Sequence, residues 1–170
     1  EWIHTDNPER LLNMKFDVII SNPPYQLDDG GNGASAKPIY HRFIEQAKKL
    51  NPRYLTMIIP ARWYAGGKGL DNFRKSMLDD GQISHLVDYV NAKDCFPGIS
   101  IGGGVCYFLR TKGYSGRCHY TNIHDGHTST AIRRLNEYEV FIRYNEAISI
   151  IEKVKEQNEK CFACHVGARN

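Results

Sequence analysis

The amino-acid sequence predicts an α/β fold with a largely parallel sheet. Three runs of apolar or β-branched residues, at 16–20, 54–59 and 83–90, are too short for helices and have the composition of buried strands. Two segments between them, at 38–50 and 70–78, repeat apolar residues every three or four positions, which is typical of amphipathic helices. Strands that alternate with helices favour crossover connections and therefore parallel pairing.

The first strand and the first helix are separated by a loop. The apolar run at 16–20 predicts a strand buried on both faces, and Pro23 and Pro24 end it because they lack backbone donors. Residues 27–37 carry several glycines and are expected to form a loop. Pro38 is then a favourable first residue for a helix.

The later elements end at similar signals. Pro60 stops the second strand, and Gly81 closes the second helix. A fourth strand is expected at 105–110. The glycine-rich loop before it is too short for a helical crossover, so we expect this strand to pair antiparallel with a nearby one. Another short strand is expected at 118–123.

A change of composition predicts a boundary after residue 112. The residues that follow it are small and polar, which divides the chain into 1–112 and 113–170. In the second part, 124–130 is expected to be a polar loop. The apolar spacing at 144–154 predicts a long amphipathic helix that packs into the core.

The composition excludes several classes of protein. Of 170 residues, 41% are hydrophobic and 24% are charged, which excludes a coiled coil, a collagen-like fibre and a disordered tail. No run of 18 apolar residues occurs, so we expect no membrane-spanning helix. Five cysteines without a secretory signal predict reduced thiols and a cytoplasmic protein. The net charge of +3 permits an acidic partner such as nucleic acid without requiring one.

The residues after the first strand form the most informative motif, Asn22-Pro23-Pro24-Tyr25. In open α/β sheets, ligand sites lie at the carboxyl ends of the strands. Asn22 offers a side-chain carbonyl oxygen, Pro23 a backbone carbonyl and Tyr25 a π face. Two oxygens can accept both hydrogens of an amine while the ring stacks beside them. The motif therefore predicts a site for a planar heterocycle that bears an amino group.

This motif and its strand closely resemble the catalytic strand and loop of N6-adenine-specific DNA methyltransferases of bacterial restriction–modification systems. The resemblance is to the class whose cofactor motif precedes the catalytic one. It covers residues 6 to about 111. Similar blocks follow at 37–44, 58–63, 66–74 and 96–109. The resemblance implies that residues 1–112 are the catalytic half of a Rossmann-like methyltransferase sheet with a terminal antiparallel hairpin, lacking the N-terminal cofactor-binding strands. Residues 113–170 would be a mixed or helical segment that starts a target-recognition or linker region, in which the long helix packs into the core or, alternatively, reads the DNA.

The same resemblance implies a reaction. A modification enzyme of this kind transfers a methyl group from S-adenosyl-L-methionine to an adenine flipped out of double-stranded DNA. Asn22 and Pro23 would then accept the hydrogens of the adenine amine within the rigid loop that Pro24 completes, and Tyr25 would stack on the base. No dedicated general base is required.

Further residues match the resemblance at single positions. Asp6 stands where the family carries an acidic residue that contacts the adenine of S-adenosyl-L-methionine; the other reading is a turn or N-cap aspartate. Arg62, Trp63 and Lys68 are expected to bind DNA through phosphates or stacking, or else to form a solvated charged face with a packed tryptophan. Phe96 is expected at the border of the base pocket, or in the core.

One departure from the family changes what is expected of the chain. The glycine-rich cofactor motif should lie well upstream of Asn22, and the 21 residues before it contain none. We therefore expect a fragment with an incomplete cofactor site, inactive alone, whose partner is the missing N-terminal part of the same protein. The alternatives are a fragment of a protein-glutamine or ribosomal RNA methyltransferase, and a non-catalytic DNA-binding fragment.

The cysteines near the end of the sequence have a spacing that could indicate a haem or metal site. Cys161 and Cys164, followed by His165, have the spacing for covalent haem attachment, but a cytoplasmic protein is not expected to carry this haem. Zinc bound by these residues, with Cys118 or His124 as the fourth ligand, is the other alternative. We expect no haem and no metal site.

Overall fold

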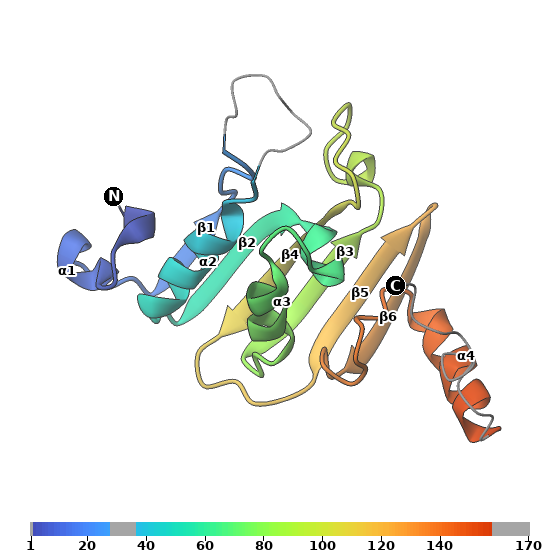
Figure 1. Cartoon of the computed structure of the whole chain (residues 1–170). Coiled ribbons are helices and arrows are strands. Elements are labelled where there is room, and N and C mark those ends of the chain that lie inside the picture. Colours follow the sequence, from blue (N-terminus) through green and yellow to red (C-terminus); the bar gives the residue numbers. More distant parts are fainter. Residues whose placement is uncertain (1, 28–36, 158–170) are drawn as a thin grey trace, which may run out of the picture.

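A six-stranded mixed sheet organises the chain. The computed structural model describes residues 2–27 and 37–157, and the strand order is β1-β2-β4-β3-β5-β6 (Figure 1). The strands are β1 (Val18–Ser21), β2 (Tyr54–Pro60), β3 (Ile83–Tyr89), β4 (Val105–Thr111), β5 (Cys118–His124) and β6 (His127–Arg133). The helices are α1 (Pro8–Leu12), α2 (Tyr40–Lys49), α3 (Asp71–Leu78) and α4 (Asn145–Glu156), with 3-10 turns η1 (Trp2–His4), η2 (Ala61–Ala65) and η3 (Ala92–Asp94).

The strand pairing confirms the predicted α/β architecture, but the sheet is mixed and not largely parallel as expected, because three of the five strand pairs among the described residues are antiparallel. β1 pairs parallel with β2, and β3 pairs parallel with β5. β4 lies between β2 and β3 and is antiparallel to both. This placement confirms the antiparallel pairing expected of the fourth strand, because its connection from β3 contains only a short 3-10 turn and no crossover helix.

The core lies on one face of the sheet, under α2 and α3 (Figure 1). Alternate residues of β2, namely Leu55, Met57 and Ile59, point to this face and are buried. Ile44 of α2 and Phe73 of α3 pack on them. This one-sided cover explains why the strands alternate between buried and exposed residues.

The prediction that the first strand is buried on both faces is wrong. Val18 and Ile20 of β1 are 50% and 76% exposed, whereas Ile19 packs against the core. The strand registers place Ile20 on the same face as Ile132 of β6, which is also exposed. An apolar run indicates a strand, but burial of its second face needs a covering layer that these side chains lack here.

Two further predictions fail in the second part of the chain. Residues 124–130 were expected to form a polar loop, yet residues from His127 onward form β6. Asp125 and Gly126 both have positive φ and form the two-residue turn of a β5–β6 hairpin. The helix expected at 144–154 is present as α4, but it buries no residue, and Ile150 and Val154 are exposed. Figure 1 shows α4 extending away from the sheet.

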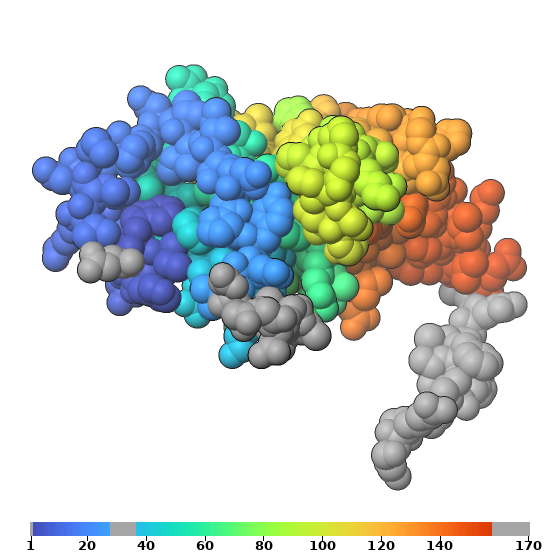
Figure 2. Space-filling model, turned by 90° about the horizontal axis from the view of Figure 1, so that it is seen from above, coloured from blue at the N-terminus to red at the C-terminus, as the bar shows by residue number. Residues whose placement is uncertain are grey.

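The division at residue 112 stays a prediction, and β5 lies beside β3 within the same sheet. None of the helices in residues 2–27 and 37–157 is long and apolar enough to cross a membrane. Figure 2 looks down on the end of the sheet where β1 and β2 finish. There the blue segment around Asn22–Tyr25 lies close to the yellow-green loop that leads into β4.

Candidate active site

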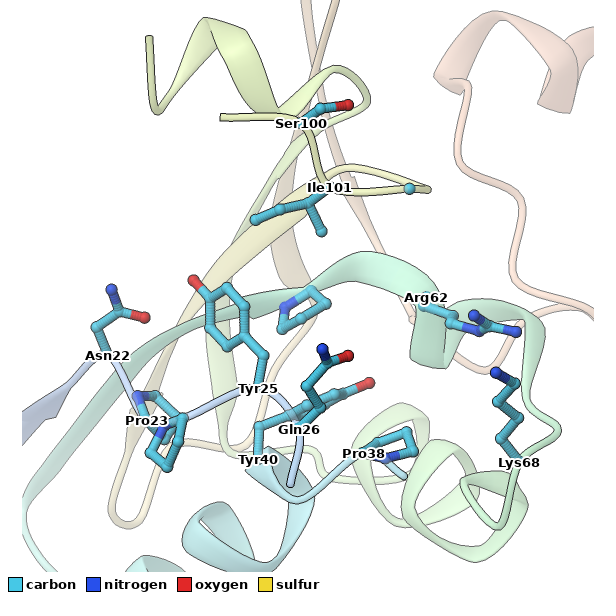
Figure 3. A pocket seen from close by; sticks show the side chains of 13 residues that line it. Asn22, Pro23, Tyr25, Gln26, Pro38, Tyr40, Arg62, Lys68, Ser100 and Ile101 are labelled. Atoms are coloured by element: carbon cyan, nitrogen blue, oxygen red, sulfur yellow. The ribbon is translucent and has the colours of Figure 1, made fainter. Parts of the chain in front are cut away.

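A cavity of about 600 Å³ opens at the carboxyl ends of β1 and β2. Because these strands are parallel, the residues that follow them meet at the same edge of the sheet. The cavity is lined by Asn22, Pro23, Pro24, Tyr25, Gln26, Pro38, Tyr40, Pro60, Arg62, Lys68, Ser100, Ile101 and Gly102 (Figure 3). The structure therefore brings the whole predicted motif together with two of the predicted DNA-binding residues.

Backbone hydrogen bonds hold the segment after the motif. Gln26 forms an isolated antiparallel bridge with Pro38, and the amide of Ile39 donates to the carbonyl of Tyr25 over 3.1 Å. The motif is thereby tied at one end to β1 and at the other to the start of α2. Figure 3 shows the side chains of Asn22 and Tyr25 next to each other.

Two tyrosine hydroxyls at the cavity are buried. Neither Tyr25 nor Tyr40 has a hydrogen-bond partner for its hydroxyl among the described residues. Burial raises the pKa of Tyr25, the thiols of Cys95 and Cys106 raise it further, and the Asn22 side chain partly lowers it. Burial also raises the pKa of Tyr40. Both side chains are therefore neutral phenols, and Tyr25 presents an uncharged aromatic ring at the cavity.

A glycine turn forms the wall opposite the motif. The carbonyl of Gly104 accepts a hydrogen bond from the amide of Ala61 over 3.0 Å, and the amide of Gly104 donates to Ile101 over 3.0 Å. Gly104 has φ of +83°, and a Cβ there would overlap the carbonyl oxygen of Tyr89. Only glycine fits this position, so the turn at Ser100–Gly102 is pressed against the ends of β2 and β3.

Positive charge collects at one end of the cavity. Arg62 and Lys68 are exposed, and Figure 3 shows their side chains near each other. Neither forms an ion pair within the described part of the chain. None of the described residues that line the cavity is acidic. Two cations without a carboxylate partner favour an anion such as a phosphate at this end.

Trp63 belongs to the core and does not line the cavity. It is fully buried, its Nε1 donates to the Cys106 sulfur over 3.4 Å, and its ring centroid lies 4.4 Å from that of Tyr64. The expectation that Trp63 stacks on DNA is therefore corrected to the other reading, a packed tryptophan. The turn η2 directs Arg62 outward and Trp63 inward, a distinction that adjacency in the sequence does not reveal.

The remaining predicted residues lie elsewhere. Phe96 is half-buried in the loop before β4, but Ser100 and Ile101 of that loop line the cavity in its place. Asp6 is exposed and is not among the lining residues. The glycine-rich stretch at 28–36 and the cysteines at 161 and 164 lie outside the described residues. Among the described residues, no cluster of three potential metal ligands occurs.

Sequence reasoning missed the part of the wall that comes from outside the motif. Tyr40 belongs to the amphipathic helix expected at 38–50 and is buried, yet it also lines the cavity. Gln26 and Ile101 carry no local signal. They reach the site because the Gln26–Pro38 bridge and the Gly104 turn bring their segments together.

Comparison with known proteins gives matches to methyltransferases. Residues 1–96 match the model of the family described as Eco57I restriction-modification methylase. A Mycoplasma pneumoniae protein named as an uncharacterized adenine-specific methylase is 43% identical over 107 residues, which cover 61% of this chain and 25% of that protein. The type II restriction enzyme and methyltransferase RM.Eco57I of Escherichia coli is 28% identical over 107 residues, which cover 52% of this chain and 11% of that enzyme.

A solved structure supports the fold. The methyltransferase subunit of a type I restriction-modification system from Streptococcus thermophilus superposes with a TM-score of 0.50 at 15% identity. The match covers 95% of this chain and 36% of that subunit. The chain spans only a quarter or less of the length of the two sequence relatives.

Proposed function

Because the chain belongs to the Eco57I restriction-modification methylase family, we propose that the cavity beside Asn22–Tyr25 receives an adenine extruded from double-stranded DNA for methylation of its amino group. One observation carries this proposal. The cavity combines two carbonyl acceptors and an aromatic ring with two cations, Arg62 and Lys68, that pair with no acidic residue in the described part of the chain. A nucleotide has the complementary parts: an amine on a flat base, and a phosphate.

The described residues can prepare the amine for reaction. The lone pair of the adenine amine is delocalised into the ring, so the free amine is a poor nucleophile. Acceptance of its two hydrogens by the Asn22 side-chain oxygen and the Pro23 carbonyl favours a pyramidal nitrogen whose lone pair is available. The new C–N bond would form as the carbon–sulfur bond of the donor breaks. The same two oxygens would stabilise the positive charge that grows on the nitrogen, until one amine proton is released to water.

Tyr25 and the cations fix the position of the nucleotide. Stacking of the base on the Tyr25 ring is worth about 1–3 kcal/mol. Arg62 and Lys68 lie on the same cavity as the motif and are suited to the phosphate next to the extruded base. Because binding already holds the base in this geometry, much of the entropy cost of bringing the reactants together is met before the reaction step.

The methyl donor expected for this family is S-adenosyl-L-methionine, which supplies an activated methyl group on a positively charged sulfur. The described lining of the cavity does not fit this molecule, because it holds two cations and no acidic residue, and Asp6 lies off the described wall. We propose that the donor is held mainly by parts of the intact protein outside the described residues, that Asp6 is the one contact from within them, and that the described residues alone are inactive.

The test is the position of the transferred methyl group. The intact protein is incubated with methyl-labelled S-adenosyl-L-methionine and duplex DNA, and the DNA is digested to nucleosides. We expect label in N6-methyladenine. Asn22→Ala should lower the transfer at least about 100-fold, the scale seen when one transition-state hydrogen bond is removed. Asn72→Ala is the matched control, because Asn72 is exposed on α3 and does not line the cavity.

Other results would select the alternatives. Label in the glutamine of an added translation factor, or in guanine of ribosomal RNA, with none in DNA adenine would overturn the proposed substrate. Duplex binding without any transfer by the intact protein would favour a non-catalytic DNA-binding role. Normal transfer by Asn22→Ala would remove Asn22 from the mechanism.

A further inference from the structure

A buried ion pair connects the segment before α4 to the sheet beneath the cavity. Asp88 of β3 is completely buried, and Arg143 reaches it with two nitrogens. Arg143 Nη2 lies 2.6 Å from Asp88 Oδ1, and Arg143 Nε lies 2.8 Å from Asp88 Oδ2. This is the bidentate arrangement in which a guanidinium fits a carboxylate best.

The third nitrogen of the same guanidinium holds the glycine turn. Arg143 Nη1 donates to the carbonyl oxygen of Gly103 over 2.9 Å. Gly103 follows Gly102, which lines the cavity, and a Cβ built on Gly103 would lie 3.9 Å from the backbone of Arg62. One side chain therefore connects a buried carboxylate to the wall of the cavity.

The anchor at Asp88 is itself held in place. The Tyr120 hydroxyl donates to Asp88 Oδ2 over 3.0 Å, and Asn122 Nδ2 donates to the same oxygen over 3.1 Å. The Arg143 guanidinium also lies over the Tyr64 ring, 5.3 Å from its centroid. Burial disfavours the charged guanidinium, but the bonds to Asp88 outweigh it and raise the pKa of Arg143. The Arg143 guanidinium is therefore charged where it joins Asp88 to Gly103.

We propose that Arg143 is a positioning residue that holds the Ser100–Gly103 wall of the cavity in the shape that receives the extruded base. This proposal rests on the proposed function. Arg143 lies outside residues 1–96, which match the family model, so the proposal gives a residue beyond that match a part in the geometry of the site. Lysine cannot replace it, because a single ammonium cannot contact both oxygens of Asp88 and the Gly103 carbonyl with the fixed geometry of a guanidinium.

The test compares Arg143→Lys with Arg110→Lys in the intact protein. Arg110 is a matched control: it is buried and its Nε donates to Asp80 over 3.0 Å, yet it does not line the cavity. Three readouts are measured: amide hydrogen exchange at residues 101–104, kcat and KM for DNA, and fluorescence of 2-aminopurine placed at the target adenine.

We expect Arg143→Lys to increase exchange at residues 101–104 about tenfold while the strands keep their protection. We expect kcat to fall about 10- to 100-fold, the scale of a misplacement of about 1 Å, with little change in KM for DNA. The fluorescence of 2-aminopurine should change as well, because the captured base is no longer held on the Ser100–Gly103 side of the cavity. Arg110→Lys should change neither the exchange at residues 101–104 nor the kcat nor the 2-aminopurine signal.

Two results would overturn the proposal: unchanged exchange at residues 101–104 in Arg143→Lys, or equal kcat losses in the two variants. If Arg143→Lys does not fold, the double variant D88N/R143Q replaces it, with the same expected outcomes, since it removes both charges of the pair together. Failure of the proposed function is distinguishable, because the wild type would then transfer no methyl group to adenine while hydrogen exchange still reports whether Arg143 holds the wall.

Discussion

Replacement of Gly104 by alanine tests whether the cavity wall is held by close backbone packing. Gly104 has φ of +83°, and the oxygen of Val90 would lie 2.5 Å from an added Cβ, with the Tyr89 oxygen closer still. These are backbone atoms at the end of β3, so they cannot rotate away as a side chain can. We predict that Gly104→Ala displaces the turn that carries Ile101 and Gly102.

Gly103 offers a neighbouring comparison. It has nearly the same φ, +86°, but the nearest atoms to an added Cβ are Arg62 backbone atoms at 3.9 Å, an ordinary contact distance. Left-handed backbone costs a non-glycine residue about 1–2 kcal/mol, and this is the expected cost of Gly103→Ala. Gly104→Ala has the same strain plus about 1–3 kcal/mol for overpacking, hence about 2–5 kcal/mol in total.

The assay is the thermal transition of the intact protein, measured by calorimetry for the wild type and both variants. At about 2–4 °C per kcal/mol, Gly104→Ala should lower Tm by about 4–20 °C and Gly103→Ala by about 2–8 °C. Activity at a permissive temperature should fall in Gly104→Ala. Equal Tm values for the two variants would refute the steric reasoning, because the two positions differ in the space around the Cβ and hardly in φ.

Three other predictions concern the base, the phosphate and the interior. Tyr25→Ala should weaken capture of 2-aminopurine-substituted DNA by about 1–3 kcal/mol, whereas Tyr25→Phe should be mild because the hydroxyl has no described partner; equal losses would contradict stacking. Removal of both Arg62 and Lys68 should reduce the slope of log affinity against log salt by about 1 for each residue, and an unchanged slope would exclude phosphate contacts. The pKa of Asp80 is lowered, because the hydrogen bond and charge of Lys48 outweigh burial, which raises it. The stabilisation from Asp80 is therefore present above about pH 4 and is lost as the pH falls through the lowered pKa; denaturation midpoints of Asp80→Asn should lack this step.

The strands and the Asn22-Pro23-Pro24-Tyr25 motif could be predicted from local signals. Each of the first four strands begins and ends within a few residues of its prediction, because short apolar runs bounded by proline and glycine have few alternatives. The β6 strand was missed although Asp125-Gly126 is a strong hairpin signal, since its flanking residues are polar and not alternating apolar. The position of β4 between β2 and β3 required the structure.

The composition of the site was only partly predictable. Asn22, Tyr25, Arg62 and Lys68 were found from a motif and from their place after a strand, and all four line one cavity. Trp63 was misplaced, because its neighbour Arg62 points to the cavity while Trp63 packs beside Cys106 in the core. No pattern in the sequence relates Arg143 to Gly103, which are 40 residues apart.

The sequence by itself determined the strand that ends in Asn22-Pro23-Pro24-Tyr25, and with it the acceptors and the ring of the proposed base site. Those features depend on residue type and on neighbours along the chain. Only the tertiary structure decided which strand face is covered, which side chains near the motif reach the cavity, and that Arg143 holds the opposite wall. These depend on contacts between distant segments, where burial and hydrogen bonding decide among orientations that the local sequence leaves equivalent.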